Sequence, residues 1–162
     1  MPVIAKFIVA SEENAHRVSQ MAKQHYARVT KQKDIDKQYS VSAYLNRANS
    51  FTREWLMTFD VTGEDEDRQE TPLAFVVLVS ANIPNEVQGN KPLFIEQVVY
   101  SEIIDGLPEV LKRAIEIANQ RRHDVVWAEV PATDEVVKNE LASQGFREAG
   151  KREDVLLFKK TI

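Results

Sequence analysis

The sequence predicts one soluble domain of the α/β class, with a mixed sheet flanked by helices. Its 162 residues are enough for a single hydrophobic core. The composition, with 43% apolar and 28% charged residues, five glycines and six prolines, is typical of a globular protein. Segments of strand-forming residues alternate with segments whose apolar residues recur every three or four positions. We therefore expect residues 1–162 to form a single domain.

The N-terminal part of the chain predicts a strand followed by two helices. Residues 2–9 are rich in strand formers, and Ser11 before two glutamates supplies the cap and the acidic first turn of a helix. Helical spacing continues to Val29, and the polar stretch 31–37 then interrupts it. Apolar residues at helical spacing over 41–48 predict a second, shorter helix.

Three strands are expected next. Residues 51–61 and 73–79 are dense in apolar and aromatic side chains, and a polar, acidic connector over 63–70 joins them. The simplest arrangement of two such neighbours is an antiparallel hairpin, and we interpret the acids at its tip as a solvated loop. Residues 92–101 predict the third strand.

The C-terminal part predicts a helix, a strand, a second helix and a final strand or hairpin. Residues 107–122 have an apolar face, a proline in the first turn and two arginines at the end. A short buried strand over 124–130 precedes a helix over 134–143, which Gly145 ends. Residues 146–160 form the last strand or hairpin.

Charge and residue content exclude several classes of function. The net charge of -4 and the pI near 5.5 offer no basic surface for nucleic acid. Cysteine is absent, which removes disulfides and thiolate chemistry. No apolar run is long enough for a membrane span, and no signal-peptide cleavage site follows the first residues. We expect a cytoplasmic protein that is a monomer or a small oligomer such as a homodimer.

Several well-known catalytic and metal-binding motifs are missing from the sequence. His16, His25 and His123 are scattered, so we expect no metal centre and interpret them as core or surface residues. The sequence contains no Gly-x-Ser-x-Gly, no Walker loop and no Gly-x-Gly-x-x-Gly.

The predicted order of elements, β-α-α-β-β-β-α-β-α-β with one possible extra strand at the end, resembles the GNAT acyltransferases over the whole chain. Two segments carry the resemblance. Ile-Glu-Gln-Val-Val at 95–99 leads into a loop and an apolar helix, and Leu-Ala-Ser-Gln-Gly-Phe at 141–146 is similar to the family's Tyr-x-x-x-Gly-Phe turn. The resemblance implies acetyl-CoA as co-substrate and a small-molecule or peptide amine as acceptor.

The resemblance also implies a cofactor site on one strand and the helix after it. Backbone groups of Val98, Val99 and Tyr100 are expected to bind the pantetheine arm. Backbone N–H groups at the start of the next helix, here Gly106 and Leu107, are expected to bind the pyrophosphate, because the unpaired donors and the dipole of a helix N-terminus favour an anion.

This loop departs from the family's pattern of Arg or Gln, two residues, Gly, one residue, then Gly or Ala. The pattern falls on residues 103–108, where only its first glycine is kept. Ile103 stands at the Arg or Gln position and carries no polar group, and Pro108 stands at the last position and has no N–H. Acidic residues surround the loop. We interpret Asp105 and Glu109 either as helix caps or as flanks of a phosphate loop.

Transfer to an amine requires a base near the amine and an acid for the departing thiolate. The resemblance makes Glu96 the candidate base, with an exposed strand carboxylate as the alternative interpretation. Leu141 occupies the family's tyrosine position and cannot donate a proton, so Tyr100 is the candidate acid, with simple packing as its alternative. Strict alternation predicts one strand face made of Phe94, Glu96, Val98 and Tyr100.

Two hypotheses about function remain open at this point. The first is an acyl-CoA-dependent N-acyltransferase that moves an acetyl group from acetyl-CoA to an amine. The second is a binding or structural module of the same fold without catalysis, because Ile103, Pro108 and Leu141 replace the family's working residues.

Overall fold

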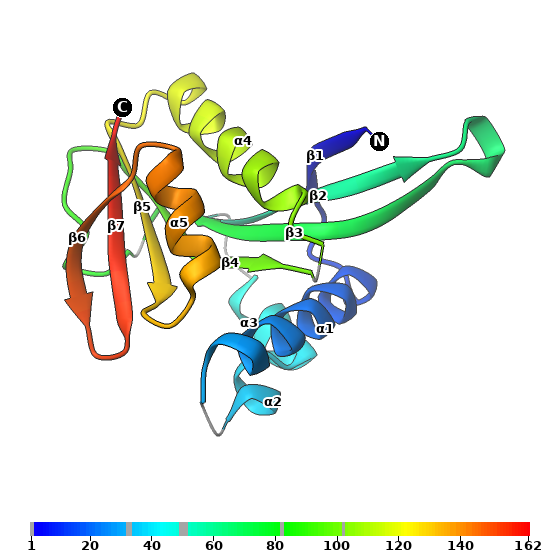
Figure 1. Ribbon diagram of the computed structural model, residues 1–162, viewed down its shortest axis with the longest axis horizontal. Helices are drawn as coiled ribbons and strands as arrows, with labels where there is room; N and C mark the ends of the chain where they lie inside the picture. Colours follow the sequence, from blue (N-terminus) through cyan, green and yellow to red (C-terminus); the bar gives the residue numbers. More distant parts are fainter. Residues whose placement is uncertain (1, 32–33, 49–51, 82, 102) are drawn as a thin grey trace.

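The computed structural model describes residues 2–31, 34–48, 52–81, 83–101 and 103–162 (Figure 1). Over these residues seven strands form one sheet in the order β1-β2-β3-β4-β5-β7-β6. Helices α1, α2 and α3 lie on one side of the sheet, and α4 and α5 lie on the other (Figure 1). The α/β class with a mixed sheet, predicted from the sequence, is confirmed.

The order of elements follows the predicted one, and of the two predicted forms of the C-terminal segment the structure has the hairpin. Two short helices were not predicted, α2 and a 3-10 helix between β2 and β3. Helix α2 lies in and just after the polar stretch that follows α1, and residues 32 and 33 of this stretch lie outside the described residues. Phe51, at the start of a predicted strand, also lies outside them. The strands are β1 (Val3–Ile8), β2 (Arg53–Thr62), β3 (Gln69–Val79), β4 (Pro92–Tyr100), β5 (Val125–Pro131), β6 (Arg147–Arg152) and β7 (Val155–Thr161). The helices are α1 (Glu12–Val29), α2 (Ile35–Gln38), α3 (Val41–Arg47), α4 (Gly106–Gln120) and α5 (Glu135–Ser143), with a short 3-10 helix (Asp65–Asp67) between β2 and β3.

Helix α1 begins and packs as its sequence predicts. The Oγ atom of Ser11 accepts a hydrogen bond from the backbone N–H of Asn14 at 3.1 Å, so the serine caps the helix. The side chains that α1 buries recur at helical spacing and pack with those of α3 against the sheet. The buried apolar residues of α1 are Ala15, Val18, Ala22 and Tyr26.

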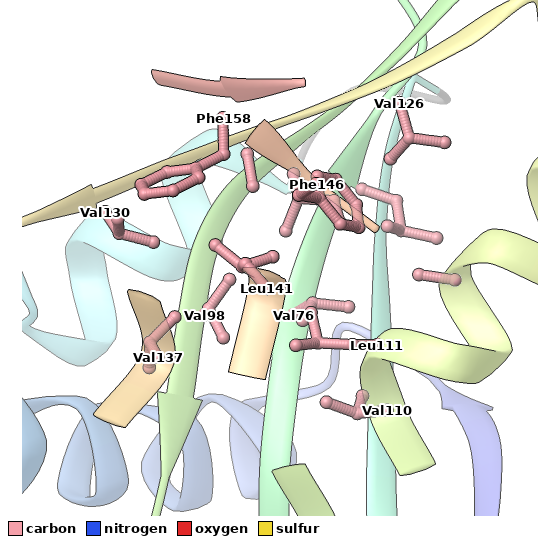
Figure 2. Close-up of a cluster of buried hydrophobic side chains, with 14 of the residues drawn as sticks. Val76, Val98, Val110, Leu111, Val126, Val130, Val137, Leu141, Phe146 and Phe158 are labelled. Carbon is pink, nitrogen blue, oxygen red and sulfur yellow. The ribbon is translucent and has the colours of Figure 1, made fainter. Parts of the chain in front are cut away.

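A hydrophobic cluster fills the space between the sheet and helices α4 and α5 (Figure 2). Leu141 is completely buried in it. The position at which the family carries a tyrosine is therefore a core position in this chain, and each such buried leucine stabilises the fold by roughly 1.5–3 kcal/mol. Members of this cluster include Val76, Val98, Val110, Leu111, Val126, Val130, Val137, Leu141, Phe146 and Phe158.

Strands β4 and β5 run parallel but pair only at their beginnings. Their register ends at Ile95 opposite Ala128, and of these two fully described strands the residues after that point are not paired with each other. Figure 1 shows the two strands diverging. We call the opening between residues 96–100 of β4 and 129–131 of β5 the β4–β5 gap, and it positions the candidate site.

Candidate active site

A β-bulge in β4 decides which side chains face the gap. Val77 of β3 pairs with Gln97, whereas the next residue, Leu78, pairs with Ile95, so Glu96 is the extra residue. A bulge reverses the alternation of side chains beyond it. Glu96 therefore lines a cavity on the side of α1–α3, whereas Tyr100 belongs to the core cluster on the α4–α5 side.

The expected face of Phe94, Glu96, Val98 and Tyr100 is therefore wrong. Phe94 and Glu96 line the same cavity, but Val98 and Tyr100 pack in the opposite layer. Strict alternation failed because it assumed an uninterrupted strand.

A cavity of about 550 Å³ lies against the gap on the α1–α3 side, and we call it the central cavity. This volume is typical of sites for small molecules. Its lining comes from α1, α2, α3, β2, β3, β4, β5, the β6–β7 hairpin and the segment that follows β3. Aromatic and charged side chains of the lining include Tyr26, Tyr39, Arg47, Arg53, Glu96, Glu129 and Arg152.

Two carboxylates face the central cavity from the two strands that diverge. Glu96 on β4 accepts a hydrogen bond from Nη2 of Arg53 at 2.8 Å. Glu129 on β5 accepts one from Nη2 of Arg152, which also contacts Glu86. Burial raises the pKa of Glu129, the Arg152 guanidinium partly opposes this effect, and the negative charge of Glu96 adds to it.

Sequence reasoning missed Glu129. The available signal was an acid within the buried run Val-Val-Trp-Ala-Glu-Val of β5, where charged residues are rarely found without a partner or a function.

Tyrosines form the wall of the central cavity beside α1 and α2. The rings of Tyr26 and Tyr39 are stacked, with centroids 4.3 Å apart. Burial raises the pKa of Tyr39 to about 12, with Arg47 opposing and Glu129 adding to the effect. These phenols therefore stay protonated near neutral pH and can donate hydrogen bonds.

Side chains of α1 reach across the β4–β5 gap to the start of α5. His25 and Asp134 are 0% and 1% exposed, and their Nε2 and Oδ2 atoms lie 2.9 Å apart, although the imidazole N–H is not aligned for a hydrogen bond. The His25 ring also contacts the Tyr100 ring edge-on at 4.7 Å. A second link joins the hydroxyl of Thr133 to the carbonyl of Val29. Protein atoms thus occupy this part of the gap.

Backbone groups of β4 differ in the direction they face. The N–H of Ser101 donates to the carbonyl of Leu73 in β3, and antiparallel pairing alternates, so Val99 also bonds toward β3. The N–H and C=O groups of Val98 and Tyr100 consequently face the gap. The carbonyl of Tyr100 already accepts from Nη2 of Arg28 at 2.9 Å. Of the three residues predicted to bind pantetheine, Val99 lacks the necessary orientation.

The start of α4 is packed against the sheet. A Cβ on Gly106 would lie 2.4 Å from Cβ of Leu73, and the Gly106 carbonyl accepts from the hydroxyl of Thr58 at 3.0 Å. The N–H of Leu107 donates to the carbonyl of Ile104 at 3.0 Å. The side chain of Asp105 makes no capping hydrogen bond. Close packing therefore explains the glycine at position 106.

A second cavity, of about 690 Å³, adjoins the central cavity and shares Thr30, Pro131 and Val155 with it. It lies between the end of α1, the segment after β5 and the β6–β7 hairpin. Its lining includes the cationic residues Arg28, Lys31 and Lys151.

Within the described ranges, no group of three or more His, Cys, Asp or Glu residues is arranged to hold a metal ion. In the same part of the chain no helix is long and apolar enough to cross a membrane.

No protein-family model and no curated protein matches this sequence. Solved structures match over nearly the whole chain. The PaiA N-acetyltransferase of Thermoplasma acidophilum, solved with coenzyme A, has a TM-score of 0.73 at 15% identity, with 100% of both chains covered. A chain of the NatC complex bound to Gag peptide and CoA has a TM-score of 0.68 at 13% identity, covering 100% of this chain and 99% of that one. The protein has the GNAT acyltransferase fold.

A third GNAT structure extends the likeness to another kind of acetyltransferase. The ribosomal-protein-alanine N-acetyltransferase of Brucella melitensis matches with a TM-score of 0.66 at 14% identity, covering 98% of this chain and 99% of that one. The predicted resemblance to the GNAT fold, including the order of its elements, is confirmed.

Proposed function

We propose that the protein is an acyl-CoA-dependent N-acyltransferase, which moves an acetyl group from acetyl-CoA to an amine bound in the central cavity. The observation that carries the proposal is the pair of carboxylates, Glu96 and Glu129, facing one cavity at the point where β4 and β5 diverge. The GNAT fold and the CoA bound to the PaiA and NatC structures support it.

The reaction joins the amine nitrogen to the acyl carbon while the bond from that carbon to sulfur breaks. The amine must first lose a proton. Glu129 is the proposed base, because burial raises its pKa toward the value that suits a general base. Glu96, the candidate from the sequence, is the second carboxylate and helps to orient the amine.

Tyr100 is the proposed acid for the departing thiolate. Burial raises the pKa of its phenol, and the charge of Asp134 adds to this effect. The bulge places Tyr100 on the other side of the sheet from the cavity that Glu129 and Glu96 line, so the proposed acid and base act from opposite sides of the β4–β5 gap.

Acetyl-CoA supplies the activated acyl thioester when it is bound. The protein groups near the β4–β5 gap fit its pantetheine arm better than its pyrophosphate. Outward-facing backbone groups of Val98 and the N–H of Tyr100 fit the amides of the pantetheine arm. The start of α4 does not fit the pyrophosphate, because the N–H of Leu107 is engaged, Pro108 has none, and residues 92–111 include no lysine or arginine.

The second candidate function is binding without catalysis. The links from His25 to Asp134 and from Thr133 to Val29 favour it, because they occupy the gap through which an acyl arm would pass.

Thermal shift and calorimetry with acetyl-CoA and with CoA test the proposal first. A ligand at 100 times its dissociation constant raises the free energy of unfolding by about 2.7 kcal/mol. We expect stabilisation by both compounds, followed by acetyl transfer to at least one member of an amine panel. If millimolar acetyl-CoA does not stabilise the protein, the acyltransferase proposal is rejected and binding without catalysis is the remaining candidate function.

A further inference from the structure

We propose that the central cavity recognises an amine that also carries an anionic group, a carboxylate or a phosphate, and that Arg47 binds this group. The amine half of this inference rests on the proposed function. The anionic half rests on the residues of the cavity alone.

Arg47 differs from the other arginines of the cavity. Arg53 and Arg152 each contact a carboxylate of the lining, Glu96 and Glu129 respectively. Among the described residues no carboxylate pairs with Arg47. Its Nη2 atom lies 3.4 Å from the carbonyl oxygen of Gln38, which is longer than a good N–H···O hydrogen bond.

An arginine without an anion is an unusual component of a partly buried lining. The Arg47 side chain, on the last turn of α3, is only partly exposed and faces the cavity. A guanidinium offers a planar set of donors that match a carboxylate or a phosphate in two parallel hydrogen bonds. A ligand anion therefore completes the bonding that the protein leaves open.

The charges of the lining favour the same class of ligand. In the described part of the chain, the cavity is lined by Arg47, Arg53 and Arg152 against Glu96 and Glu129, an excess of one positive charge. A ligand with an ammonium group alone increases this excess. A ligand that carries one anionic group beside a neutral amine, the form of the amine that reacts, balances it.

The groups proposed to bind the two ends of such a ligand line the same cavity. Arg47 faces it from α3 and Glu129 from β5. The stacked rings of Tyr39 and Tyr26 add an aromatic wall to this cavity. The amine then faces the carboxylates, and the anion faces α3.

Calorimetry with matched probes tests the inference. The probes are the L-amino acids and O-phosphoethanolamine, each compared with the amine that lacks the carboxylate or phosphate. We expect a probe that carries the anionic group to bind at least tenfold more tightly than the amine that lacks it, because hydrogen bonds to charged groups are individually strong. Comparison of the two probe types identifies whether the anion is carboxylate or phosphate.

Arg47→Gln is the diagnostic variant, and Arg17→Gln, on the exposed side of α1, is the matched control. We expect Arg47→Gln to bind the probe that carries the anionic group roughly tenfold or more weakly than the wild type does. Its affinity for acetyl-CoA should stay unchanged. Circular dichroism and thermal unfolding of the variant check that it is folded.

Three results would overturn the inference. They are equal binding of the probes with and without the anionic group, no binding of any probe that carries the anionic group, and an unchanged affinity of Arg47→Gln for such a probe. A loss of acetyl-CoA affinity in this variant would also contradict it, because the arginine would then hold the co-substrate. Acetyl transfer to an amine without an anionic group, independent of Arg47, preserves the proposed function but rejects this inference. Arg47-dependent binding of an amine with an anionic group, without acetyl transfer, preserves the anionic half of the inference but rejects the proposed function.

Discussion

The Nε2 atom of His25 lies 2.9 Å from Oδ2 of Asp134, and this contact joins α1 to the first residue before α5 across the β4–β5 gap. Both side chains are fully buried. Asp134 also caps α5, because its Oδ1 atom accepts from the N–H of Val137 at 3.3 Å. The pair therefore connects the two layers of the molecule at the place where the sheet itself is open.

His25→Leu is expected to lower the free energy of unfolding by about 3 kcal/mol, because it leaves a buried carboxylate without its partner. Urea unfolding followed by circular dichroism measures the change. Asp134→Asn keeps an oxygen for the helix cap and removes the charge, so it should cost less.

The double variant His25→Leu, Asp134→Asn isolates the interaction. We expect it to be less destabilised than the sum of the single variants by at least about 1 kcal/mol. Additivity of the two single effects within about 0.5 kcal/mol would mean that the residues contribute independently.

Gly106→Ala is expected to destabilise the protein by about 1–3 kcal/mol, the usual cost of overpacking a core. The added Cβ would lie 2.4 Å from Leu73 Cβ and 2.5 Å from Thr58 Oγ1, so α4 must shift. Gly150→Ala is the control, because its Cβ would meet Leu157 at an ordinary 3.7 Å. Thermal unfolding compares the two. Equal stabilities would remove close packing as the reason for a glycine at 106.

Much of the fold could be predicted because its signals are local. Helical spacing of apolar residues identified α1, α4 and α5, and runs of strand formers identified β2, β3 and β4. The short α2 was missed because four residues carry too little periodicity, and Ile35–Gln38 is mostly polar.

The candidate site was less predictable because it depends on relationships between distant segments. The bulge at Glu96 is a property of the pairing between β3 and β4, and it reversed the faces that simple alternation gave to Val98 and Tyr100. The contact between His25 and Asp134 arises only after α1 and α5 have packed on the sheet. Glu129, in contrast, could have been singled out as an acid within a buried strand.

Glu129→Gln is expected to lower the acetyl-transfer rate by about 10²–10⁴-fold, the usual contribution of a general base. The wild-type rate should rise with pH through the pKa of Glu129, which burial raises above the ordinary value for glutamate. This rise should disappear in the variant. Initial rates between pH 4 and about 8 measure the effect.

Glu96→Gln is the matched control for this prediction, because it makes the same chemical change on the opposite strand. We expect a smaller loss of rate and a preserved pH profile. A lost pH profile in Glu96→Gln, with Glu129→Gln unaffected, would assign the base to Glu96 instead.

Asp124→Ala is expected to destabilise the protein at neutral pH, with a difference from wild type that shrinks in acid. The backbone N–H groups of Asn90 and Lys91 donate to this carboxylate at 2.8 and 2.9 Å and hold its pKa below the ordinary value. A group whose pKa is lowered by folding contributes stability above its unfolded pKa and loses it as the pH falls through the folded value. The difference should therefore be full at pH 7 and should shrink as the pH falls through the folded pKa, which lies below the ordinary value for aspartate. Asp105→Ala, which removes an exposed aspartate without a capping bond, is the control. Urea unfolding across this range measures both variants, and a pH-independent difference for Asp124→Ala would show that its hydrogen bonds do not depend on the charge.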